Sequence, residues 1–184
     1  MMSAALDHLR LMARNNAYAN ERLYEVCCKL SQIEFVAERT NFFPSLLETL
    51  NHNWEVDRYY LDALTEGGDG LAVFEVPFLQ DANDLADAQA SVDRQLIAFC
   101  DGLWASDLER EIAQDRGGKG AVKETIAATL LHLFQHQTHH RGQAHAMLAG
   151  TSVAPPQLDE FFLKFERHPA AQRHIDTFGR EENL

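Results

Sequence analysis

Long segments with helical periodicity constrain the fold of this chain more than any other feature. Apolar residues recur every three or four positions in four stretches, a spacing that places them on one face of an α-helix. The strongest stretch lies at about 123–149 and ends before Gly150, and the others lie at about 5–30, 44–66 and 82–103. Four long helices joined by a long crossover predict an all-α fold, a four-helix bundle.

Two shorter regions interrupt this helical pattern. The glycines of the segment Asp115–Gly120 predict a small hairpin near 107–122. Pro155-Pro156 opens a short C-terminal segment, with a short helix, whose aromatic residues we expect to fold back on the bundle. The 184 residues suit one domain and suffice for a core without disulfides, so we expect residues 1–184 to form a single domain.

The charge and cysteine content exclude several classes of protein. The formal charge is -12 and we find no basic cluster, so neither nucleic acid nor an anionic membrane is an expected partner. No apolar run approaches the length of a membrane span, and the N-terminus lacks the pattern of a signal peptide. Three cysteines without a CxxC motif indicate free thiols rather than a disulfide framework, so the expected location is the cytoplasm.

Histidines are concentrated in the strongest helical segment. Residues four apart lie on one face of a helix, one turn apart, so their imidazoles can share a metal ion. Two pairs have this spacing, His132 with His136 and His136 with His140. The apolar stripe of the segment favours the second pair, because His136 and His140 lie near it whereas His132 and His139 lie toward solvent.

A third ligand must come from another helix. His52 lies in the second helical segment within a mostly apolar stretch, where an imidazole needs a partner. It lies off the main apolar stripe of that segment, on the side of Val56 and Ala63, so we expect that side to face the fourth helix. The alternative is that the histidines are surface or hydrogen-bonded residues without a function. A thermolysin-type site is excluded, because Gln137 stands where that motif has its glutamate.

Three segments of the chain resemble the DinB (damage-inducible protein) family of metal-binding bundles. They are Asn51-His52, the run from His132 to Gln143, and Pro155-Pro156-Gln157-Leu158-Asp159. The run at 132–143 reads His-Leu-Phe-Gln-His-Gln-Thr-His-His-Arg-Gly-Gln and is highly specific. The resemblance implies a four-helix bundle, a homodimer, and a metal site that carries over to His52, His136 and His140, with nickel or zinc as the cofactor.

Three neutral imidazoles leave a divalent ion its charge and an open coordination position, which is typical of a catalytic site. The family includes thiol-dependent S-transferases and a maleylpyruvate isomerase, so the resemblance implies a small-molecule substrate and a low-molecular-weight thiol as partners. We therefore expect metal-dependent transfer or hydrolysis on a small molecule. The alternative is a non-catalytic, metal-binding stress-response (damage-inducible) bundle.

Polar residues next to these histidines are candidates for supporting roles. Arg141 and Gln143 follow the ligands in the sequence, and Gln137 lies near the centre of the apolar stripe. They could orient a substrate or the imidazoles. For Arg141 the other expectation is an ion pair with Asp57, an acid that falls near the apolar stripe of the second helix.

Overall fold

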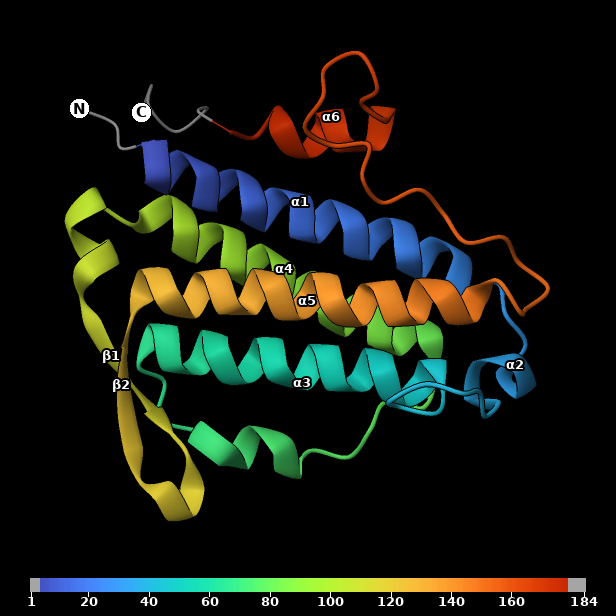
Figure 1. Ribbon diagram of the computed structural model, residues 1–184, viewed down its shortest axis with the longest axis horizontal. Helices are drawn as coiled ribbons and strands as arrows, with labels where there is room; N and C mark the ends of the chain where they lie inside the picture. Colours follow the sequence, from blue (N-terminus) through green and yellow to red (C-terminus); the bar gives the residue numbers. More distant parts are fainter. Residues whose placement is uncertain (1–3, 179–184) are drawn as a thin grey trace.

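Four long helices form the body of the computed structural model, which describes residues 4–178, and the first and last of them run in the direction opposite to the middle two (Figure 1). The expected four-helix bundle is therefore confirmed. A short helix precedes α3, and a C-terminal helix lies against the outside of α1. The helices are α1 (Ala4–Cys27), α2 (Gln32–Val36), α3 (Leu46–Thr65), α4 (Ala82–Gly102), α5 (Ile126–Leu148) and α6 (Pro169–Ile175).

Local capping residues set where these helices begin. The side chains of Ser45, Asp81 and Thr125 accept hydrogen bonds from backbone N–H groups in the first turns of α3, α4 and α5. Such caps satisfy backbone donors that have no partner inside the helix. Helix α3 ends one residue earlier than the Gly67-Gly68 pair indicates, because Glu66 itself adopts the left-handed conformation with φ 56°.

The connections between helices produce the predicted crossover. Helix α1 lies against α4 and α5, and α3 lies against the same two helices, so the consecutive helices α1 and α3 occupy diagonal positions. The connection from α3 to α4 contains η1 (Gly70–Glu75). The connection from α4 to α5 contains η2 (Ala105–Glu109), η3 (Gly117–Lys119) and the hairpin of β1 (Glu111–Asp115) and β2 (Ala121–Thr125). The small hairpin is thus confirmed, a few residues further along the chain than expected.

A buried polar layer divides the core of the bundle into two apolar clusters. One cluster lies around Leu9, Leu130 and Leu133, and the other around Leu23, Leu50 and Leu148. Between them, each long helix contributes two buried polar side chains. We call this set the polar layer: Asn16 and Asn20 of α1, Asn53 and Asp57 of α3, Gln89 and Asp93 of α4, and Gln137 and Arg141 of α5.

The C-terminal segment only partly follows the sequence expectation. Phe161 is fully buried and packs against Tyr18 of α1, with ring centroids 5.7 Å apart. Phe162 and Phe165 are 48% and 84% exposed, so the expectation that all these aromatic residues fold back on the bundle is wrong for these two. None of the described helices is both long enough and apolar enough to cross a membrane.

Candidate metal centre

His52, His136 and His140 lie together on the side of the bundle where α3 packs against α5. Their candidate ligand atoms all lie within 4.8 Å of one another. The Nε2 atoms of His52 and His136 are 3.1 Å apart, and the ring centroids of His136 and His140 are 4.4 Å apart. The side of α3 that carries His52 and Val56 therefore faces α5, as the three-histidine arrangement requires.

The spacing of these nitrogens suits a single transition-metal ion. Two imidazole nitrogens bound to one ion at about 2.0–2.1 Å lie roughly 2.9–3.4 Å apart in tetrahedral or octahedral geometry. The 3.1 Å separation between His52 and His136 falls inside that range. The candidate nitrogen of His140 lies within 4.8 Å of both others, so it would have to move closer to them to complete this geometry. Within residues 4–178, these three side chains are the group of histidine, cysteine and acidic residues that could hold an ion.

The three imidazoles are neutral at physiological pH. Burial lowers the pKa of His52 to about 4, with a further contribution from His140. Burial also lowers the pKa of His136 to about 3, and the neighbouring histidines lower it further. The pKa of His140 is lowered as well, mainly by burial. Since the neutral form of histidine is the one that binds metals, the site presents ligands without first having to lose protons.

Two neighbouring side chains shape the surroundings of the three imidazoles. The ring of Phe43 lies 4.4 Å from that of His52 and 5.6 Å from that of His140, so an aromatic face borders the site. On the other side, Gln143 Oε1 lies 2.7 Å from His140 Nδ1 and accepts its proton in a hydrogen bond. That bond directs Nε2 of His140 toward the other two imidazoles, as outer partners of metal-binding histidines do.

The other histidines of α5 have different partners. The ring of His132 packs edge-on against Tyr60, and His139 is exposed beside Gln143. His145 Nε2 lies 2.9 Å from the carbonyl oxygen of Pro156, which ties α5 to the C-terminal segment. His136 and His140 therefore lie on the face of α5 that meets His52, and the other three histidines lie outside this cluster.

The expected ion pair between Arg141 and Asp57 is not formed, and this prediction is wrong. The guanidinium of Arg141 donates to the side-chain oxygens of Asn16, Asn20 and Gln137. Gln137 in turn donates from Nε2 to Asp57 Oδ2. Gln137 therefore lies between the two charged groups, and the neutral amides satisfy both of them inside the core.

The carboxyl groups of the polar layer are held in a medium that disfavours their charge. Burial, and then the nearby Asp93, raise the pKa of Asp57 to about 7. Burial raises the pKa of Asp93 to about 6, although the hydrogen bonds from Asn20 and other amides act to lower it. Burial also lowers the pKa of Arg141 to about 10, although both carboxyl groups oppose that change. The layer thus combines a permanently charged guanidinium with two acids that titrate near neutral pH.

Sequence reasoning identified the three histidines but missed part of their surroundings. Phe43 is spaced like a residue of the main apolar stripe of the second helical segment, and His52 lies off that stripe, so the spacing did not place Phe43, which lies before α3, beside His52 and His140. Gln143 was recognised as a candidate to orient an imidazole, and the structure pairs it with His140. Gln137 makes no hydrogen bond to the imidazoles, because it points into the polar layer.

Comparison with known proteins identifies relatives of both the sequence and the fold. The model of the DinB family matches residues 2–173. The protein DinB of Bacillus subtilis (strain 168) is 25% identical over 148 residues, which cover 76% of this chain and 85% of that protein. The crystal structure of a DinB-like protein from Bacillus cereus ATCC 10987 superposes with a TM-score of 0.60 at 19% identity, over 76% of this chain and 90% of that one. The structural likeness concerns the fold alone.

Proposed function

Because the chain belongs to the DinB family, we propose that His52, His136 and His140 bind one divalent transition metal, nickel or zinc, and that this centre acts on a small molecule. The proposed reaction is metal-dependent transfer or hydrolysis, with a low-molecular-weight thiol as cosubstrate. The observation that carries the proposal is the convergence of three neutral imidazoles from two helices.

The chemistry of the ligand set supports a reactive rather than a structural metal. Structural sites for ions such as zinc are closed by four protein ligands, whereas three ligands leave a position for water or substrate. A divalent ion held there would supply Lewis acidity toward a water molecule or a thiol. No acidic side chain of the described residues belongs to the set, so the protein would not neutralise the charge of the ion.

The residues around the imidazoles support this role in different ways. Gln143 holds the Nδ1 proton of His140 and keeps Nε2 free as a ligand atom. The same amide lies 3.3 Å from His139 Nε2 through its own nitrogen and donates to it, so Gln143 joins a buried and an exposed imidazole. Phe43 covers one side of His52 and His140 and excludes water there. Phe42, 78% exposed, extends this aromatic border toward solvent.

Metal content is the first test of the proposal. Untagged protein should contain about one ion per chain, because a histidine tag would itself bind metal. We expect His52→Ala to lose most of this ion, since two imidazoles from one helix cannot close the site. His132→Ala is the matched control, because His132 lies on the same helix as two ligands but packs against Tyr60. Elemental analysis that finds full metal content after all three histidines are replaced by alanine would disprove the proposal.

Turnover separates an enzyme from a protein that only binds metal. The metal-loaded protein is incubated with a panel of thiols and electrophiles, and with hydrolysable esters and amides. We expect turnover that is lost in His52→Ala and kept in His132→Ala. Metal binding without turnover on any substrate would instead favour the non-catalytic stress-response bundle. Elemental analysis of the same sample distinguishes nickel from zinc, which imidazole ligands alone do not.

Replacing Gln143 tests how the site is oriented. Gln143→Leu should weaken metal affinity by about 10-fold or more, the usual effect of removing an outer hydrogen-bond partner. The physical reason is that His140 Nδ1 loses the acceptor that it has among the described residues, and the ring is free to rotate. Competition with a chelator measures the affinity, and Gln135→Leu on the exposed side of α5 serves as the control. Equal affinities in the two variants would show that Gln143 does not position the ligand.

The homodimer and the cytoplasmic location remain predictions. Sedimentation of the untagged protein tests the first, and cell fractionation tests the second. The net charge of -12 argues against nucleic acid as a partner, and a salt-dependent shift of DNA mobility at physiological ionic strength would contradict that expectation.

A further inference from the structure

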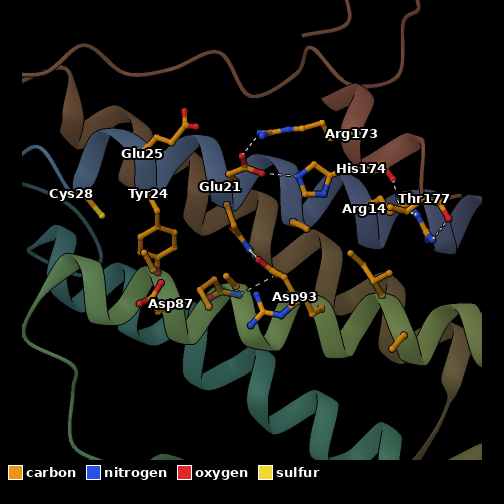
Figure 2. A pocket seen from close by; sticks show the side chains of 18 of the residues that line it. Arg14, Glu21, Tyr24, Glu25, Cys28, Asp87, Asp93, Arg173, His174 and Thr177 are labelled. Carbon is orange, nitrogen blue, oxygen red and sulfur yellow. Dashed lines mark hydrogen bonds and ion pairs between the residues drawn. The ribbon is translucent and has the colours of Figure 1, made fainter. Parts of the chain in front are cut away.

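A groove of about 970 Å³ lies along α1 and α4, and Arg173, His174 and Thr177 also line it (Figure 2). Its volume matches that of small-molecule sites in proteins. None of the three histidines of the metal centre lines it. The groove instead reaches the polar layer from α1 and α4, through Asn20, Gln89 and Asp93.

The charges along the groove leave two carboxyl groups without a cationic partner. Glu21 is paired with Arg173 and His174, and Asp101 is paired with Arg14. Glu25 is paired with Arg22.

Two acids of α4 remain after these pairs are assigned. Asp87 is exposed and forms no ion pair among the described residues, and Asp93 is buried and accepts hydrogen bonds from neutral amides. Arg94 also lines the groove, but it is exposed, next to a solvent that screens its charge. Arg141 of the polar layer acts on Asp93 from inside the core, but on the groove side these two carboxyl groups have no ion-pair partner among the described residues, which favours a cation over an anion there.

Two buried polar atoms at the groove have no hydrogen-bond partner among residues 4–178. They are the hydroxyl oxygen of Tyr24 and Oε1 of Gln89, in side chains 5% and 1% exposed. Figure 2 shows the ring of Tyr24 crossing the groove from α1 toward α4. A buried polar atom without a partner costs free energy, so such atoms are expected where a ligand completes the bonding.

The hydrogen bonds of Gln89 determine what kind of ligand fits. Its Nε2 group donates both protons, one to Asp57 Oδ2 at 2.9 Å and one to Asp93 Oδ1 at 3.2 Å. Only the acceptor Oε1 is left, so the missing partner has to be a donor. A donor beside Asp93 and Asp87 is favoured further if it carries a positive charge.

Beside the polar and acidic side chains, part of the groove wall is apolar. Ala86, Ala90 and Ile97 of α4 and Ala17 of α1 line it between the acidic residues. Small side chains leave room along the two helices, and an aliphatic chain would bury apolar surface there. The ligand thus needs a cationic donor at one end and a hydrocarbon portion beyond it.

We infer that this groove binds an aliphatic primary amine, whose ammonium group donates hydrogen bonds to Gln89 Oε1 and the Tyr24 hydroxyl beside Asp93 and Asp87, once these two buried side chains turn toward the groove. The ammonium group offers three donors, enough to serve both unpartnered oxygens and a carboxylate. The site is separate from the metal centre, so its occupancy does not require the metal.

The test uses n-hexylammonium chloride as the probe, in phosphate buffer, because an amine buffer would compete. Calorimetry and amide chemical shifts are recorded on the full chain after the metal has been removed with a chelator, since an amine could also bind a metal ion. We expect one amine per chain, with shifts confined to α1, α4 and residues 173–177. 1-Hexanol and hexanoate, which keep the hydrocarbon but lack the cation, should bind much more weakly.

Two variants and one control link this binding to the groove. Tyr24→Phe removes a hydroxyl that has no hydrogen-bond partner in the part of the chain that the structure describes, so the variant should fold normally, yet bind the amine about 10-fold more weakly. Asp87→Asn removes an exposed charge and should weaken binding by about 2- to 5-fold. Asp84→Asn on the same helix lies outside the groove and should leave the affinity unchanged.

Several results would overturn the inference. One is the absence of heat and of chemical-shift changes at about 10 mM amine, a concentration that would reveal even a weak site. Another is equal binding of 1-hexanol, which would show that the charge has no role. Equal losses in Asp84→Asn and Asp87→Asn would indicate only the general acidity of the surface, and unchanged binding by Tyr24→Phe would place the amine elsewhere.

Discussion

The Arg141→Met protein should have a free energy of unfolding about 3–5 kcal/mol smaller than the parent at pH 7. Arg141 is 5% exposed and donates to Asn16, Asn20 and Gln137, so its removal leaves three buried acceptors short of a donor. It also removes the cation that opposes the charges of the two buried acids. Methionine fills most of the volume, so the loss reports the polar contacts rather than a cavity.

Urea denaturation at several pH values measures this loss. The destabilisation should be smaller at pH 5, where Asp57 and Asp93 are largely protonated and need the cation less. Arg94→Met is the control, because Arg94 is exposed and such substitutions usually change stability by less than about 0.5 kcal/mol. A loss below about 1 kcal/mol for Arg141→Met at pH 7 would show that the polar layer does not depend on its guanidinium.

The Asp57→Asn protein should be more stable than the parent at pH 8, by on the order of 3 kcal/mol. The pKa of Asp57 rises from 3.8 to about 7 on folding, mainly because of burial. Between these values the folded state binds more protons than the unfolded state, so the contribution of Asp57 to stability falls as pH rises from about 4 to about 7. Asparagine keeps an oxygen that can accept from Gln137 and Gln89, and it has no charge to bury.

Subtracting the unfolding free energy of the parent from that of Asp57→Asn at each pH isolates the contribution of Asp57. The lowered pKa values of His52 and His136 act in the opposite direction in the metal-free parent, since the unfolded state then binds more protons as pH falls below about 6.5. Both proteins share that effect, so subtraction removes it. The difference should be near zero at pH 4 and reach its full value above pH 7. Asp69→Asn, at an exposed aspartate, should give a flat difference, and a flat difference for Asp57→Asn would contradict the prediction.

The arrangement of the helices was largely predictable because apolar periodicity is a local property of the sequence. The long helices lie within a few residues of their expected bounds, and the glycine-rich turn at 115–120 correctly indicated a hairpin. The convergence of His136 and His140 also followed from spacing along one helix. The position of His52 required knowledge of which side of α3 faces α5, and that depends on contacts between segments 84 residues apart.

The polar layer could not be predicted for the same physical reason. Asn16 reads as a residue that weakens the first helix, and on a helical wheel Gln89 is simply polar. Both are 1% exposed in the folded chain, since each finds hydrogen-bond partners on other helices. A polar side chain is buried when such partners offset its loss of hydration, and the partners are distant in sequence. The expected direct pairing of Arg141 with Asp57 failed because the amide of Gln137 lies between them.

The hydrogen bonds of Arg141 also limit how far α5 can turn about its own axis. Arg141 points into the polar layer, whereas its neighbour His140 and the preceding His136 point toward α3. A rotation of 20° would move an atom at the roughly 5–6 Å outer radius of the helix by about 2 Å, enough to break these bonds and to separate the imidazoles. The hydrogen bonds of the guanidinium therefore restrict rotation of α5, and the angular position of the two histidines is set from inside the bundle.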